Sequence, residues 1–378
     1  MKKIVSGLLA ASLAMLLALP ARAGSLAVEA EACLLMEKTT GQILYAVNEH
    51  QQLEPASVTK IMTILLVMEA IDSGALAYDD MVAASAYACS MGGSQIWLKE
   101  NEQMSVEEML KAVCVASAND CSVALAEHLA GSADAFVERM NQRAGELGMN
   151  DTNFLNPTGL PAQGHVTSAH DIALMSRELI LNHPDIRRFT TIWTDTLRDG
   201  AFGLSNTNKL IRFYQGATGL KTGSTDSALY CLSATAERDG MELIAVILKS
   251  PTSTQRFESA KTLLNYGFAA YALALAQPPE PLAPIPVDLG EAPAVTPRLA
   301  GDPSILAAKE KVNAMEVQIE LEERLSAPVE EGQQVGRMVV TSGGEVLSEL
   351  PLVADRPVAR LTYWQILERC LQAAFMGG

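Results

Sequence analysis

Positive charge is scarce in this chain. Its 378 residues include 28 lysines and arginines against 44 aspartates and glutamates, and the formal net charge at pH 7 is −16. Binding to nucleic acid, or to anionic lipid by charge alone, requires a basic surface. We therefore expect no nucleic-acid partner and no tight electrostatic docking on a membrane.

Cysteine is also sparse, and no two cysteines form a Cys-x-x-Cys pair. A thiolate zinc site is therefore not expected. In an exported chain cysteines could pair as disulfides. Most of them lie within apolar stretches, such as residues 32–35 and 112–115, which favours small buried side chains without a bond partner. The cysteines are Cys33, Cys89, Cys114, Cys121, Cys231 and Cys370.

Long hydrophobic runs are absent except at the N-terminus. Lys2 and Lys3 precede an apolar stretch over residues 4–19, and Ala21-Arg22-Ala23 follows it. This order predicts a secretory signal peptide over residues 1–23, cleaved after Ala23. The alternative, an uncleaved membrane anchor, is less favoured because a spanning helix needs about 20 apolar residues. We expect an exported protein at the outer face of the cytoplasmic membrane or in the cell wall.

Strand patterns at both ends of residues 24–276 enclose a helical middle. Alternation over residues 29–46, with Thr39-Thr40-Gly41 between its halves, predicts a β-hairpin. Helical spacing is found over residues 57–71, 106–115, 123–129, 136–147, 171–182 and 253–266. Short strands are predicted over residues 219–225, 230–236 and 243–248. The order implies an α+β fold with a largely antiparallel sheet whose first and last strands meet.

Beyond residue 276 the sequence pattern changes first to a proline-rich linker with short strands and then to an amphipathic tail. Prolines over residues 277–284 predict a stiff linker, and short strand patterns over residues 285–358 predict a small all-β domain. In the tail, residues 359–378, Tyr363, Trp364 and Leu367 begin the apolar face of an amphipathic helix. That helix could lie in a membrane interface or pack on the β domain or a partner, and the sequence leaves both open.

Three short strings carry the chemistry: Ser57-Val58-Thr59-Lys60, Ser117-Ala118-Asn119 and Lys221-Thr222-Gly223-Ser224. Each alone has an ordinary explanation as a helix cap, a capping turn or a strand beside a turn. Together they supply a nucleophilic hydroxyl, an amine to take its proton, a second serine, a carboxamide and a second amine. This set predicts acyl transfer through a covalent seryl intermediate.

Lys60 would have to be neutral to act as a base. A helix that begins at Ser57 places Lys60 one turn later on the same face. The unperturbed pKa of lysine is about 10.4, and burial together with a second nearby cation lowers it. Lys221 is the candidate for that cation, and Gly223 on the same strand would let a ligand approach the backbone closely.

The combination of Ser-x-x-Lys, Ser-x-Asn and Lys-Thr-Gly is typical of active-site serine enzymes that recognise penicillin. The chain resembles this superfamily, and within it the low-molecular-mass penicillin-binding proteins, the serine-type D-alanyl-D-alanine carboxypeptidases of peptidase family S11. The likeness covers nearly all of the mature chain. It is carried by residues 55–63, 152–160, 167–171, 219–223 and 325–329, the last followed by Gly332-Gln333.

The resemblance implies a serine β-lactamase/transpeptidase-like domain over residues 24–276, with an antiparallel sheet flanked by helices, then a small β-sandwich-like domain and an amphipathic helix. It implies that Ser57 is acylated, that Lys60 is its base and that Ser117 relays protons. No cofactor is implied. The implied substrate is the peptidoglycan stem pentapeptide, and β-lactam antibiotics are implied inhibitors.

The resemblance also implies binding roles. Asn119 would hold the peptide, and Lys221 with Thr222 the terminal carboxylate, while the backbone N–H groups of Ser57 and Ser224 would form the oxyanion hole. Gly223 belongs to the same strand, and Arg256 falls where the family carries an arginine that assists carboxylate binding. Two positions depart from the family pattern: Ala118 in the middle motif and Leu229 where glycine is usual, which leaves the groove width open.

Other functions remain to be weighed. A β-lactamase would need a deacylating Glu-x-x-Leu-Asn loop, which residues 146–150 do not match in spacing. A zinc D,D-peptidase would use His165, His170 and Asp171, but no His-Glu-x-x-His accompanies them. A wall-binding or β-lactam-sensing module without activity is disfavoured because every motif side chain is present. A D,D-endopeptidase or transpeptidase activity beside hydrolysis stays open.

Overall fold

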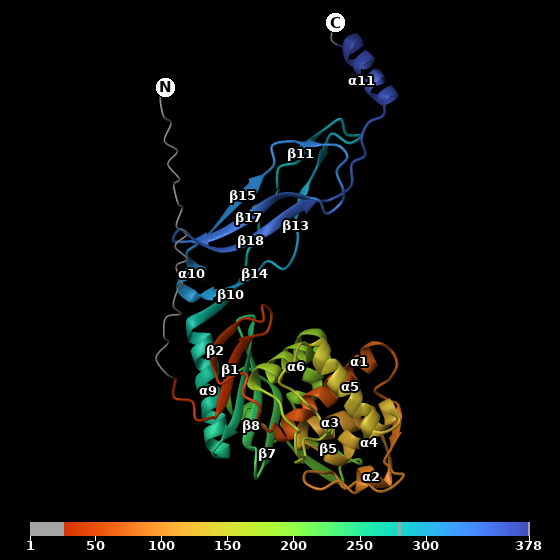
Figure 1. The fold of residues 1–378 in the computed structure, drawn as a ribbon, viewed down its shortest axis with the longest axis vertical. Coiled ribbons are helices and arrows are strands. Elements are labelled where there is room, and N and C mark those ends of the chain that lie inside the picture. Colours follow the sequence, from red (N-terminus) through yellow and green to blue (C-terminus); the bar gives the residue numbers. More distant parts are fainter. Residues whose placement is uncertain (1–25, 279–280, 377–378) are drawn as a thin grey trace, which may run out of the picture.

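A computed structural model describes residues 26–278 and 281–376 of the chain (Figure 1). The predicted signal peptide, residues 1–23, lies outside the described residues. The molecule is elongated: a larger mixed α/β part is followed by a narrower β part, and the last helix lies at the far end (Figure 1).

A five-stranded antiparallel sheet organises the larger part. Its order is β2-β1-β9-β8-β7, so the predicted meeting of the first and last strands is confirmed by the pairing of β1 with β9. The predicted hairpin is also present, as β1 and β2. The strands are β1 (Ala32–Glu37), β2 (Ile43–Val47), β7 (Ala217–Thr225), β8 (Leu229–Arg238) and β9 (Met241–Ser250). Asp239 and Gly240, between β8 and β9, have left-handed φ angles.

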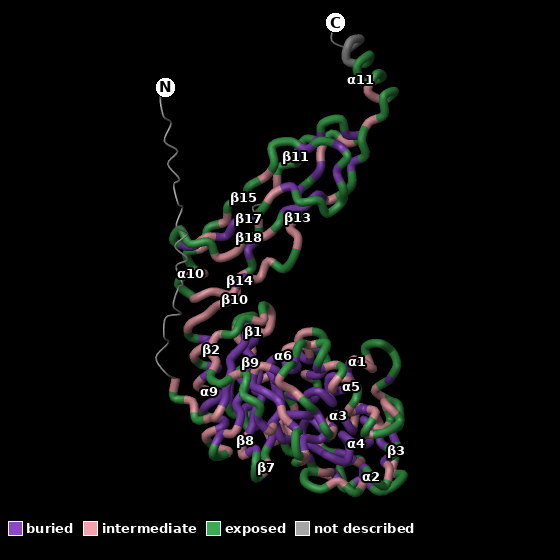
Figure 2. The backbone as a smooth tube through the Cα atoms, in the orientation of Figure 1, coloured by how far each residue is buried: buried purple, intermediate pink, exposed green. Residues whose placement is uncertain are grey.

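Helices cover both faces of this sheet. In β1, Leu34 and Met36 join the core formed with the central helices, whereas Cys33 and Leu35 join the core beneath α9. Period-two alternation therefore buries both faces, and Figure 2 shows the buried residues gathered in this part of the molecule. The long helices are α1 (Lys60–Asp72), α3 (Val106–Ala116), α4 (Asn119–Ala130), α5 (Ala133–Glu146), α6 (Ala169–Asn182) and α9 (Ser253–Ala270).

Two helix starts differ from the sequence-based expectation. Ser57 lies in a 3₁₀ turn, η1 (Ala56–Thr59), and α1 begins only at Lys60. Asn119 is the first residue of α4 rather than part of a loop, because Ser117 and Ala118 alone separate α3 from α4. Both differences place a motif residue in a helical turn: Ser57 in η1 and Asn119 in the first turn of α4.

Short elements fill the remainder of the larger part. Two hairpins escaped prediction because strands of three or four residues are too short to show alternation. These elements are α2 (Ala86–Cys89), η2 (Pro184–Ile186), α7 (Arg187–Thr190), α8 (Leu210–Phe213), and the hairpins β3 (Met81–Ala83) with β4 (Gln103–Ser105) and β5 (Thr194–Leu197) with β6 (Phe202–Ser205).

The C-terminal part is built from strands, as its sequence pattern predicts. A four-stranded sheet has the order β13-β18-β17-β15, and β11 pairs with β12 and β16. β10 pairs with β14 across the predicted linker. The elements are β10 (Tyr271–Leu275), β11 (Ile285–Asp288), β12 (Ala294–Val295), β13 (Pro297–Leu299), β14 (Ser304–Ala308), α10 (Lys309–Asn313), β15 (Met315–Leu321), β16 (Leu325–Ser326), β17 (Gln334–Ser342), β18 (Glu345–Ala354) and α11 (Tyr363–Met376).

Neither disulfides nor spanning helices are found in the described parts of the chain. All the cysteines are free, and Cys370 is the exposed one. Burial raises the pKa of the Cys33 thiol to about 11 and that of Cys114 to about 12, so these thiols act as small apolar groups. Among the described helices, none has the length and apolar character needed to cross a bilayer.

Candidate active site

The turn η1 presents Ser57 at the surface of a buried segment. Its neighbours Ala56 and Val58 are buried, whereas Ser57 is partly exposed. Ala56 has a left-handed φ of 48°, and the loop that contains Gly159 packs directly on it. A Cβ at Gly159 would lie 1.8 Å from the Ala56 carbonyl oxygen. Only glycine fits here, so this loop fixes the turn that carries the hydroxyl.

Lys60 is completely buried and points its amine at Ser57. The distance from Nζ to Ser57 Oγ is 3.0 Å, and Nζ also donates to the Thr158 carbonyl at 2.6 Å. Burial pushes the pKa of Lys60 well below its ordinary value, and the charge of Lys221 lowers it further. The amine is therefore a base within hydrogen-bond reach of the hydroxyl it would deprotonate.

Lys221 and Ser117 form a second amine–hydroxyl pair. Ser117 has a left-handed φ of 65° between α3 and α4, and Lys221 Nζ donates to its Oγ at 2.9 Å. Burial, helped by the charge of Arg256, lowers the pKa of Lys221 to about 7. Strand β7 and the α3–α4 junction thus bring together residues that lie far apart in the sequence.

Asn119, two residues after Ser117, has an unused hydrogen-bond acceptor. Its Nδ2 donates to the Gly92 carbonyl at 2.7 Å, but its buried Oδ1 has no hydrogen-bond partner among the described residues. A buried acceptor without a donor costs free energy. A ligand N–H group would remove that cost.

Strand β7 lies against η1 at Gly223. A Cβ at Gly223 would be 2.8 Å from both the Ser57 nitrogen and the Pro55 carbonyl oxygen. Thr222 is buried, and its hydroxyl donates to Thr207 at 2.7 Å, whereas Ser224 is exposed. β7 is the last strand in the order of its sheet among the described residues, and an edge strand can pair with an extended ligand.

Arg256 approaches the motif from α9. Its Nη1 donates to the carbonyls of Gly223 and Cys231, at 3.0 and 3.1 Å. Burial lowers the pKa of Arg256 to about 10, and no carboxylate forms an ion pair with it in the described structure. The guanidinium therefore adds positive charge behind the strand that carries Lys221.

Several positioning residues have no chemical signature in the sequence. Asn156 Oδ1 accepts from the Thr158 and Gly159 nitrogens at 3.1 and 2.7 Å, which fixes the carbonyl that receives Lys60. Asn156 lies within residues 152–160, a stretch that resembles the family, and this resemblance was the sequence signal for its role. Thr207, which orients the Thr222 hydroxyl, gave none.

His165 supports η1 from the same loop. Leu155 donates its N–H to Nδ1 at 3.0 Å, so Nε2 carries the proton and donates to the Thr59 hydroxyl at 2.8 Å. Burial lowers the pKa of His165 to about 4, which keeps the ring neutral. His170 instead stacks on His50. The described structure does not gather His165, His170 and Asp171 into a metal-ligand cluster.

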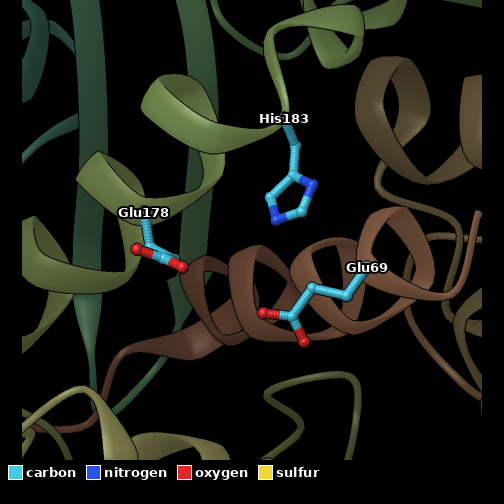
Figure 3. Close-up of side chains that lie close together, drawn as sticks. All are labelled: Glu69, Glu178 and His183. Atoms are coloured by element: carbon cyan, nitrogen blue, oxygen red, sulfur yellow. The ribbon is translucent and has the colours of Figure 1, made fainter. Parts of the chain in front are cut away.

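One group in the described chain does have metal-ligand spacing: Glu69, Glu178 and His183 (Figure 3). Arg143 already donates to both carboxylates, at 2.7 and 2.6 Å. Glu69 lies nine residues beyond Lys60 on α1, or about 14 Å along the axis. The cluster is an ion-pair junction between α1, α5 and α6 and is separate from the site of Ser57.

Comparisons with known proteins identify the family and the fold. The family of D-alanyl-D-alanine carboxypeptidases, Peptidase S11, matches residues 20–252, and the C-terminal domain of penicillin-binding protein 5 matches residues 284–360. The chain belongs to the D-alanyl-D-alanine carboxypeptidase family. It is a low-molecular-mass penicillin-binding protein and a serine-type D-alanyl-D-alanine carboxypeptidase.

Relatives of this family match over most of their length. D-alanyl-D-alanine carboxypeptidase DacF of Bacillus subtilis is 41% identical over 93% of this chain and 91% of its own. Penicillin-binding protein 5 of Haemophilus influenzae has a TM-score of 0.79 at 31% identity, covering 88% of this chain and 98% of its own. Penicillin-binding protein D2 of Listeria monocytogenes, solved in an ampicillin-bound form, has a TM-score of 0.59 at 34% identity over 65% of this chain and 99% of its own. The predicted fold is confirmed.

Proposed function

We propose that Ser57 attacks the carbonyl carbon between the two terminal D-alanines of a peptidoglycan stem pentapeptide. The observation that carries this proposal is the 3.0 Å contact between Ser57 Oγ and the amine of Lys60, whose pKa burial has lowered. Lys60 takes the hydroxyl proton as the new C–O bond forms. The developing oxyanion is held by the backbone N–H groups of Ser57 and Ser224.

Collapse of the tetrahedral intermediate breaks the C–N bond and releases D-alanine. Ser117 donates its hydroxyl proton to the leaving nitrogen and regains a proton from the neighbouring amines. The hydrogen bond from Lys221 to Ser117 favours this transfer. Water then attacks the carbonyl carbon of the Ser57 ester as Lys60 takes the water proton. The C–O bond to Ser57 breaks, and Lys60 returns that proton to Ser57 Oγ. The products are the shortened peptide and the free enzyme, so no cofactor is needed.

Binding is assigned to the opposite wall of the cleft. Lys221 and Thr222 hold the terminal carboxylate, and the positive charge of Arg256 supports them from behind. Asn119 accepts an N–H of the peptide through its unused Oδ1. Gly223 keeps β7 close enough to Ser57 for the peptide to pair with the strand edge.

A penicillin adduct tests the nucleophile. After treatment with benzylpenicillin, intact mass should show a single penicilloyl adduct, and Ser57→Ala should show none. Ser326→Ala, at an exposed serine of β16, is the matched control and should keep the adduct. Release of one D-alanine from a synthetic pentapeptide should follow the same pattern. An adduct that persists in Ser57→Ala contradicts the assignment.

We also propose export by a signal peptide over residues 1–23 and membrane contact through α11. Tyr363 and Trp364 at the start of this helix are 73% and 74% exposed, and the helix lies far from the catalytic part (Figure 1). Replacing both by Ser should release the protein from membrane pellets. Unchanged pelleting would favour a protein partner or packing on the β domain.

The proposed domain limits are residues 24–276 for the catalytic domain, 277–284 for the linker, 285–358 for the β domain and 359–378 for the tail. No regular element lies between β10 and β11 in the described residues. The pairing of β10 with β14 indicates that the end of the first domain is tied to the second. Limited proteolysis should cut first near residues 277–284.

A further inference from the structure

Trp97 is an exposed aromatic residue with a costly backbone conformation. Its side chain is 66% exposed, and its φ angle is +62°. The left-handed region is sterically disfavoured for a bulky residue. Such outliers persist where the surroundings force them, and they cluster at functional sites.

A buried carboxylate holds the peptide groups on both sides of Trp97. Asp120 is fully buried and accepts from the nitrogens of Ile96 and Leu98, each at 3.1 Å. Arg198 donates to the Ile96 carbonyl at 2.8 Å. The backbone is therefore fixed on both sides of the residue, while the indole is held out in water.

The loop of Trp97 contacts Asn119, one of the motif residues. Asn119 donates its backbone N–H to Ser94 at 2.7 Å and its side-chain N–H to Gly92. A Cβ at Gly93 would lie 2.9 Å from Asn119 Nδ2 and 3.8 Å from the side chain of Leu160, from the opposite loop. Trp97 follows Ser94 by three residues, which is at most about 11 Å of chain.

The indole borders a hollow of about 650 Å³ whose other lining residues are polar. The charges balance, with Lys99 and Arg198 against Glu100 and Glu102, so the hollow does not select a charged ligand. It offers one flat apolar face among many hydrogen-bonding groups. A pyranose ring has the complementary form, with an apolar C–H face and a polar rim.

We propose that Trp97 and this hollow bind a hexosamine of the glycan strand to which the stem peptide is attached. The proposal rests on the proposed function, because the peptide must lie with its scissile bond at Ser57. Four extended residues of a stem peptide span about 14 Å, which exceeds the at most about 11 Å of chain between Trp97 and Ser94, the residue whose carbonyl accepts from Asn119. The enzyme therefore prefers glycan-linked stem peptides over free ones.

Two substrates test this subsite: a synthetic pentapeptide, and the same peptide linked to a disaccharide of N-acetylglucosamine and N-acetylmuramic acid. We expect kcat/KM to be about tenfold higher for the linked substrate, the upper range of one aromatic contact. In Trp97→Ala the ratio of the two values should fall toward one. Trp97→Phe keeps a flat apolar face and should retain most of the preference.

Phe213→Ala is the matched control, because Phe213 is 65% exposed and lies on α8 rather than on the loop of Trp97. It should keep the wild-type ratio. Equal values for both substrates in the wild type, or an unchanged ratio in a Trp97→Ala protein of normal Tm, would overturn the proposal. An equal loss on both substrates would assign the indole to the peptide and refute the glycan subsite. Failure of the wild type on both substrates would instead contradict the proposed function.

Discussion

The catalytic part of the molecule, residues 26–276, buries Lys60, Lys221 and Arg256, whereas Ser342 is the buried polar side chain among the described residues of 281–360. Ion pairs in the β part, such as Arg337 with Glu320, lie at its surface. Burying a charge away from water costs stability. The comparison indicates that the catalytic part tolerates this cost at the residues proposed for its chemistry, while the described β part keeps its charged side chains out of the buried core.

Loss of the base should produce the largest effect. Lys60→Met keeps the length of the side chain but removes the proton acceptor, and we expect the rate of penicillin acylation to fall about 10²–10⁴-fold. Stopped-flow or mass kinetics would measure it. Lys311→Met, on exposed α10 of the β part, should leave the rate unchanged. A near-normal rate in Lys60→Met would show that another group takes the proton.

Matched glycine substitutions compare the two parts directly. Gly223→Ala would place a Cβ 2.8 Å from the Ser57 nitrogen, and Gly336→Ala would place one 2.3 Å from the Glu320 carbonyl oxygen. Both should lower stability, but only the first should slow acylation, by about tenfold or more. Acylation rates together with thermal melts separate the two. Slow acylation in Gly336→Ala would mean that the β part shapes the site.

The buried amines should make stability depend on pH. The pKa of Lys221 is about 7 in the folded protein and about 10.4 in the unfolded chain. Between these values the unfolded state binds more protons, so the free energy of unfolding rises with pH, and below about 7 the destabilisation is complete. The Tm should therefore increase from pH 7 to 9.5, and less so in Lys221→Met. An equal increase in both proteins would contradict this account.

Leu229 should give a smaller effect. It has a φ of +52° at the start of β8, where the family usually carries glycine. Leu229→Gly removes a steric cost of about 1 kcal/mol, so the Tm should rise by a few degrees. An unchanged or lower Tm would show that packing of the leucine side chain outweighs its backbone strain.

The smallest effect is expected at the surface of the β part. Arg337 pairs with Glu320 and Glu349 at 2.6 and 2.9 Å, and all these side chains are about half exposed. Ion pairs between exposed side chains contribute little to stability. Arg337→Ala should therefore leave the midpoint of urea unfolding nearly unchanged, and a clear loss would mean that the β part depends on its surface charges.

Patterns that repeat along the chain were predictable, whereas short elements were not. The alternation in β1 and the helical spacing of α1 were long enough to read, but β3 to β6 were too short. The start of α1 was predicted at Ser57, yet η1 precedes it, because packing of Gly159 on Ala56 shapes that turn. Thr207 could not be identified as a site residue, since it acts through a contact with a distant segment. Thr158, which also acts through such a contact, was indicated by the likeness of residues 152–160 to the family.

The sequence by itself determined which reactive groups the protein carries, because the three motifs supply the hydroxyls of Ser57 and Ser117, two amines and a carboxamide in the order typical of one enzyme family. Only the tertiary structure decided the protonation states of these groups and the direction in which their side chains point. The low pKa of Lys60 comes from burial and from Lys221 on a distant strand, and its direction comes from Ser57 and the Thr158 carbonyl. How far a group is buried and how close it lies to other charges depend on the three-dimensional fold, so the spacing of residues along the chain does not determine them.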